Sequence, residues 1–180
     1  MSDEPNEPEF VLKGQSMNTT NFLTRRLMVC SALLAAGSTA SRAWAHHGWS
    51  SFDQEQPLYL EGIARQVRWR NPHAEFMLEP DSRLTLPADL ASRPVPAQSA
   101  PVEAARLLSR ARLPDKQASR WEIELAPLFR MSQWQIPEIR DGERVAAVGF
   151  GLREQGATPL MRVEFLFLQG KVYPMRSSPA

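Results

Sequence analysis

The three histidines are the residues of this sequence best suited to chemistry, and they fall at two places. His46 and His47 directly follow Ala43-Trp44-Ala45, and His73 follows an Asn-Pro pair. Small residues at Ala43 and Ala45 are typical of a signal-peptidase site. Cleavage after Ala45 would expose the α-amine of His46, and that amine together with the histidine ring can chelate a metal ion.

A site built from histidine nitrogens suits copper or zinc, and Cu²⁺ heads the affinity order of the divalent ions. We expect His46 to supply its amine and ring, His73 or His47 to supply the third nitrogen, and Met77 or Glu75 to serve as an axial ligand. In the alternative interpretation, the adjacent histidines are a flexible chain end, and His73 caps the turn by hydrogen bonding to backbone.

The segment before these histidines has the features of an export signal. Arg25 and Arg26 precede an apolar run at 27–36, which is too short and too rich in small residues to span a bilayer stably. The arginine pair fits a twin-arginine signal, and it also fits an ordinary secretory signal. We expect residues 1–45 to be an N-terminal extension and signal peptide, and the mature protein to be periplasmic.

Two further features bear on this segment. Acidic residues between Met1 and Met17 are unusual before a positive signal, so either methionine is a candidate start. The single cysteine, Cys30, lies inside the signal. The mature chain therefore has no disulfide, and a soft-metal site in it must use histidine or methionine.

Composition excludes one class of partner. The formal net charge is +1 at pH 7, and such a balance provides no electrostatic footprint for nucleic acid. Residues 46–180 are long enough for one hydrophobic core. We predict a single domain over 58–176, preceded by an extended arm over 46–57, with no stable membrane span after signal removal.

The first two strands should position His73. Alternating apolar residues predict a strand over 58–69, which bends at Gly62, and Asn71-Pro72 predicts a turn. A second strand follows over 73–78. Because strand side chains alternate, His73, Glu75 and Met77 share one face, opposite Ala74, Phe76 and Leu78.

Residues 80–119 differ from the rest in their many prolines. A connection of this length is unusual in a compact domain and is often a functional excursion or disordered. We predict a flexible insertion in a hairpin, with a short helix over 102–108 and arginines in solvent. A partner-docking helix is the alternative.

The remaining elements complete an all-β fold. Strands are expected over 121–125, 144–150, 160–168 and 172–175, and Pro127 opens a short helix over 128–131. In the strand 160–168, Met161, Val163, Phe165 and Phe167 should share one side. This order predicts an OB-like barrel of five to six strands with one short helix, and a small β-sandwich is the competitor.

The tryptophans and the acidic residues give weaker signals. Trp69 and Trp121 fall at inward positions, whereas Trp134 follows the short helix and is the best candidate for an exposed ligand-binding face. Glu122 and Glu124, two apart on one strand, are a common solvated pattern. No catalytic arrangement stands out, so we do not expect an enzyme.

The stretch Ala45-His46-His47-Gly48-Trp49, followed by Asn71-Pro72-His73, resembles a family of small exported bacterial proteins of unknown function. That resemblance implies localisation and a small β domain, and it implies no activity. The leading hypothesis is therefore a periplasmic protein that binds copper through its histidines. The alternative is a non-catalytic interaction module that binds an envelope protein or a small ligand on the barrel face.

Overall fold

The computed structural model describes residues 48–115 and 118–180. Strands dominate it, as predicted. They are β1 (Phe52–Arg68), β2 (Glu75–Pro80), β3 (Trp121–Glu124), β4 (Arg144–Leu152), β5 (Leu160–Leu168) and β6 (Lys171–Pro174). The short helices are η1 (Trp49–Ser51), η2 (Leu90–Ser92), α2 (Ala104–Arg110) and α3 (Leu128–Gln133). In the part of the chain that is described, no helix is long and apolar enough to cross a membrane.

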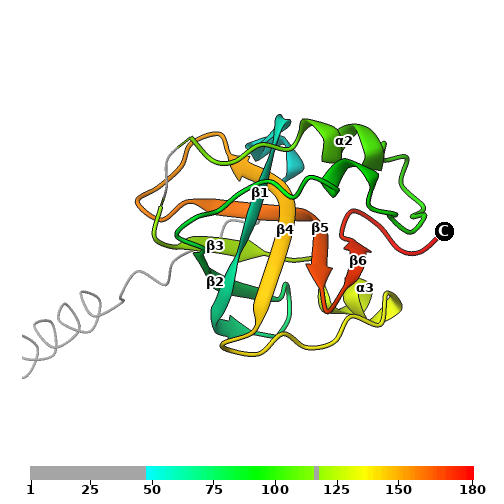
Figure 1. Cartoon of the computed structure of the whole chain (residues 1–180). Helices are drawn as coiled ribbons and strands as arrows, with labels where there is room; N and C mark the ends of the chain where they lie inside the picture. Colours follow the sequence, from blue (N-terminus) through cyan, green and yellow to red (C-terminus); the bar gives the residue numbers. More distant parts are fainter. Residues whose placement is uncertain (1–47, 116–117) are drawn as a thin grey trace, which may run out of the picture. The chain divides into compact units, whose positions relative to one another are not determined.

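The strands form one sheet that closes in a ring. Their order is β3-β2-β1-β4-β5-β6, and a parallel pairing of β3 with β5 joins the two sides. The ring therefore runs β1-β2-β3-β5-β4, with α3 between β3 and β4 in the chain (Figure 1). The OB-like arrangement predicted from the sequence is confirmed, and the two separate sheets of a sandwich are absent from the described residues.

The long strand β1 belongs to both halves of the ring, and Gly62 makes this possible. Gly62 lies opposite Pro80 of β2 on one side and Val145 of β4 on the other. A Cβ atom at this position would overlap the backbone carbonyl of Glu79. β1 begins at Phe52, so the last residues of the predicted arm are part of the barrel.

A β-bulge at Glu164 changes which face of β5 points inward. Val163 lies opposite Gly149 and Phe165 lies opposite Val148, so Glu164 is an extra residue on β5. Beyond the bulge the alternation is reversed. The prediction that Met161, Val163, Phe165 and Phe167 share one side was therefore wrong, because sequence alternation does not register an inserted residue.

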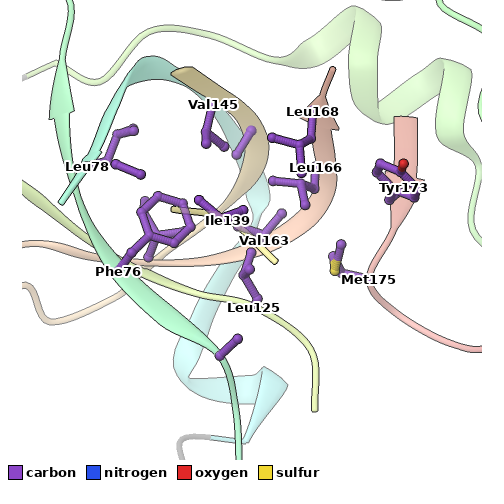
Figure 2. Close-up of a cluster of buried hydrophobic side chains, with 14 of the residues drawn as sticks. Phe76, Leu78, Leu125, Ile139, Val145, Val163, Leu166, Leu168, Tyr173 and Met175 are labelled. Carbon is purple, nitrogen blue, oxygen red and sulfur yellow. The ribbon is translucent and has the colours of Figure 1, made fainter. Parts of the chain in front are cut away.

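Two hydrophobic clusters result from this reversal. Met161 and Val163 join the core inside the ring, and Leu166 and Leu168 join it from beyond the bulge. Figure 2 shows part of this core, in which side chains from β2, β4 and β5 meet those of Tyr173 and Met175. Phe165 and Phe167 instead pack in a second cluster with Tyr59, Val148, Leu90 and Leu108.

The second cluster explains how the insertion is held. Its residues Leu90 and Leu108 are buried, with exposed fractions of 4% and 2%. Backbone bonds join the insertion to β1, from Arg112 N to Pro57 O at 3.0 Å and from Tyr59 N to Arg112 O at 2.8 Å. The arginines of α2 are exposed as expected, but the apolar side of the insertion is covered. This packing argues against a flexible insertion. The flexibility of residues 80–119, predicted from their composition, stays a prediction.

We expect Gly62→Ala to lower the free energy of unfolding by about 1–3 kcal/mol, because β1 and β2 must separate to admit the methyl group. Urea denaturation would measure the change. Gly156→Ala is the matched control, since the nearest atom to its new Cβ would be 3.8 Å away. Equal stability of the two variants would contradict the close approach of the strands.

A second prediction concerns the insertion. Leu108→Ala should cost about 2–5 kcal/mol, because Leu108 is the buried residue of α2 and the substitution leaves a cavity beneath the helix. Leu86→Ala, at a residue with 41% exposure in the same insertion, should change stability by less than about 0.5 kcal/mol. Thermal unfolding of both variants would decide, and a neutral Leu108→Ala would favour a mobile insertion.

Candidate functional site

The structure describes only some of the predicted site residues. His46 and His47, the cleavage residues Ala43 and Ala45, and the export arginines Arg25 and Arg26 lie outside the described residues. His73, Glu75, Met77 and Trp134 are described. The contacts of these four residues show which side chains lie close to His73.

His73 lies just before β2, after the Asn71–Pro72 peptide, which is cis. Its side chain is 23% exposed, and its Nδ1 atom is 3.9 Å from Oε1 of Glu124. The segment is held against β3 because Leu125 N donates to Ala74 O at 2.9 Å. His73 is therefore next to a carboxylate that comes from a strand distant in the sequence.

Glu75 and Met77 lie on the predicted face of β2. Ala74, Phe76 and Leu78 are buried, whereas Glu75 and Met77 are half-buried on the other face. Glu75 Oε1 is 2.5 Å from Arg68 Nε. Burial raises the pKa of Glu75 above its usual value, and Arg68 offsets only part of that effect. Because Glu75 is already paired with a cation, it is a weaker metal-ligand candidate than the sequence indicated.

The salt bridge between Glu124 and Arg162 is the most informative contact in this region, and it was not predicted from the sequence. Glu124 is 5% exposed, so the prediction of a solvated acidic pattern on β3 was wrong for this residue. Its Oε1 accepts from Arg162 Nε at 2.9 Å, and Arg162 Nη2 contacts the same oxygen. Glu124 and Arg162 face each other across the parallel β3–β5 pairing. No short-range signal links two residues of different strands in this way.

Arg162 in turn supports Trp49, which lies at the start of the described chain. The Arg162 guanidinium is 5.2 Å from the Trp49 ring centroid, and the Arg176 guanidinium is 3.7 Å from it. Phe52 and Phe150 lie at ring-centroid distances of 6.5 and 6.3 Å from Trp49. Cation–π contacts of this kind favour both the ring and the charge when they are partly desolvated.

Arg176 has its own buried carboxylate. Glu164, the bulged residue of β5, is 0% exposed. Its Oε2 accepts from Arg176 Nε at 2.8 Å, and Nη1 of Arg176 donates to Gln54 Oε1 at 3.1 Å. Two Arg–Glu pairs therefore support one indole ring. We call Trp49, Arg162, Glu124, Arg176 and Glu164 the Trp49 clamp.

The Trp49 clamp and His73 form one continuous set of contacts. Trp49 is stacked on Arg162, Arg162 binds Glu124, and Glu124 lies beside His73. The structure thus brings the start of the described chain near the histidine that follows the Asn-Pro turn. Among residues 48–115 and 118–180, no three His, Cys, Asp or Glu side chains form a group that could hold a metal ion.

The tryptophan predictions have mixed outcomes. Trp121 is 4% exposed in the barrel core, as expected of an inward position. Trp134 is half-buried, and its Nε1 donates to Ser177 O at 2.8 Å. It lines a groove of about 1090 Å³, together with Tyr59, Arg93, Phe167, Lys171 and Tyr173. Part of its ring is therefore used to hold the C-terminal segment.

We expect Glu124→Gln to destabilise the fold by about 3–5 kcal/mol, because Arg162 would keep its charge in a largely buried place without its counter-ion. Equilibrium unfolding would measure this cost. Glu154→Gln, at an exposed position, is the control and should stay within about 0.5 kcal/mol of the wild type. Glu124→Leu combined with Arg162→Met should recover most of the loss. A stable Glu124→Gln variant would show that the pair is unimportant.

Comparison with known proteins finds one family model that matches part of the chain, and it gives no activity. Residues 33–84 match the model of DUF6152, a family of unknown function. The matched span contains His46, His47, Trp49 and His73, and it ends before Glu124 and Arg162. The comparisons with curated proteins and with solved structures find no match.

Proposed function

We propose that this chain is an exported, periplasmic protein that binds a transition-metal ion, with copper as the preferred ion. The ligands would be the α-amine and ring of His46, with the rings of His47 and His73. The single observation that carries this proposal is the Trp49 clamp, because it ties the chain close to its predicted mature end to the carboxylate beside His73.

Chain length supports the meeting of these histidines. His46 is two residues before Gly48, and two residues of extended chain cover at most about 7 Å. Trp49, the next residue, is already fixed over Arg162. An anchored neighbour lowers the conformational entropy that the chain end loses when it binds a metal.

The chemistry of the described residues fits an imidazole site. A carboxylate that accepts a hydrogen bond from a ligating histidine fixes the ring and increases its strength as a ligand. Glu124, whose Oε1 is 3.9 Å from Nδ1 of His73, would take this role once metal binding draws the ring closer. Glu124 would act as this positioning group and not as a ligand, because its Oε1 already accepts from Arg162. A chain cleaved after Ala45 would contain no cysteine, and thiolates are the ligands that soft ions such as Cu⁺ prefer. Nitrogen ligands would therefore favour Cu²⁺.

The groove at Trp134 favours a second candidate, the binding of a small ligand or an envelope protein without catalysis. Its volume of about 1090 Å³ and its aromatic lining suit a ligand that is partly apolar. His73, the histidine that the structure describes, is not among the residues that line this groove. Binding there would leave copper titrations unchanged.

We expect the protein whose first residue is His46 to bind one Cu²⁺, as measured by calorimetry and by nitrogen hyperfine splitting in electron paramagnetic resonance. Adding one glycine before His46 should weaken binding roughly tenfold or more, or about 1.4 kcal/mol, because the amine is displaced. His73→Ala should weaken it similarly and remove one nitrogen from the spectrum.

The control is Arg70→Ala, an exposed residue close to His73 in the sequence but not proposed as a ligand. It should bind copper as the wild type does. Unchanged binding by the glycine-extended protein would overturn the role of the amine. If His73→Ala lowered only the unfolding temperature, the turn-capping interpretation would hold instead. Mass spectrometry of the exported protein would establish its first residue.

A further inference from the structure

The Trp49 clamp contains a buried acid that the proposed metal site does not use. Glu164 is 0% exposed and lies at the β5 bulge. Its only cationic partner among the described residues is Arg176, with 2.6 Å between Nη2 and Oε2. The other oxygen, Oε1, is buried, and the neutral amide of Gln98 is the further side-chain group beside this carboxylate. The charge of this carboxylate is thus balanced by one side chain.

Arg176 connects that carboxylate to the start of the chain. Its guanidinium stacks on Trp49 at 3.7 Å, the shortest of the cation–π distances found among the described residues. The Arg176 side chain is 22% exposed, so it has a direct way into solvent. If the charge of Glu164 were removed, hydration would compete with the remaining contacts of Arg176.

We propose that Glu164, Arg176 and Trp49 form a proton-operated latch on the N-terminal arm. A charged Glu164 keeps Arg176 on Trp49 and so holds the arm on the barrel. When Glu164 takes up a proton from solvent, Arg176 moves outward and Trp49 loosens. This inference rests on the proposed function in one respect: it makes the latch a control on the metal site.

The groups around Glu164 indicate that Glu164 itself is the one that takes up the proton when the pH falls. On β5 the nearest charge is Arg162, which Glu124 of β3 neutralises. Opposite on β4 are Val148 and Gly149, which carry no charge. β1 and the insertion contribute neutral amides, Gln54 and Gln98, and the C-terminal segment contributes Arg176.

The electrostatics agree with this geometry. Burial raises the pKa of Glu164 above its usual value, and the hydrogen bond and charge of Arg176, together with a hydrogen bond from Gln98, offset only part of the effect. A carboxyl whose pKa is raised on folding binds its proton more tightly in the folded state. Acidification toward about pH 4.5 therefore adds stability to the protein, relative to a variant without this carboxyl.

The latch is tested on the purified protein without metal, by following the indole N–H signals in nuclear magnetic resonance spectra from about pH 8 to about pH 4.5. The signal missing in Trp49→Phe identifies Trp49. In the wild type this signal should shift or broaden as pH falls. In Glu164→Gln it should have its acid-form position throughout and show no titration. The exposed Glu154→Gln is the control and should titrate like the wild type.

A Trp49 signal that ignores pH in the wild type, or that still titrates in Glu164→Gln, would overturn the latch. If Glu164→Gln does not fold, Arg176→Met gives the second measurement, because removing the guanidinium should leave Trp49 in its acid-form state at every pH. These signals are recorded without copper. A working latch without copper binding would therefore reject the proposed function alone, and copper binding without a titrating Trp49 would reject only the latch.

Discussion

The salt bridge between Glu124 and Arg162 is the contact on which the rest of this structure depends. β3 and β5 close the ring, and only three residue pairs join them. The last of these pairs is Glu124 with Arg162, whose charges meet on the outside of the barrel where Trp49 covers them. The interaction that completes the sheet is therefore the same one that anchors the beginning of the chain.

A buried salt bridge loses the hydration free energy of both ions, and the contacts around Glu124 and Arg162 show how this loss is offset. Removing a carboxylate and a guanidinium from water costs several kcal/mol for each ion in effective terms, and the pair repays this only with good geometry and added contacts. Arg162 makes a forked contact with Glu124 and stacks beside Phe52 at 4.6 Å. Apolar residues at these two positions would close the barrel without this desolvation penalty.

Much of the fold could be predicted from local patterns, and the site could not. The strand 160–168 was predicted with its observed ends, because alternation and turn residues are local signals. The face reversal after Val163 escaped prediction, since one extra residue at Glu164 is invisible without its partner strand. The burial of Glu124 escaped for the same reason. Its partner Arg162 is 38 residues away, and only closure of the ring brings the two together.

Charge balance connects the latch with the proposed metal site. With Glu164 and Glu124 both charged, each arginine of the Trp49 clamp has a carboxylate partner, so these two pairs would add no net charge beside the proposed metal site. A proton on Glu164 leaves Arg176 unbalanced, so the surroundings gain one positive charge and the arm loses a contact. Both effects oppose a bound cation, and by linkage a bound cation opposes that proton. Metal release on acidification would therefore not depend on histidine protonation alone, because Glu164 supplies a second proton-binding group outside the ligand set.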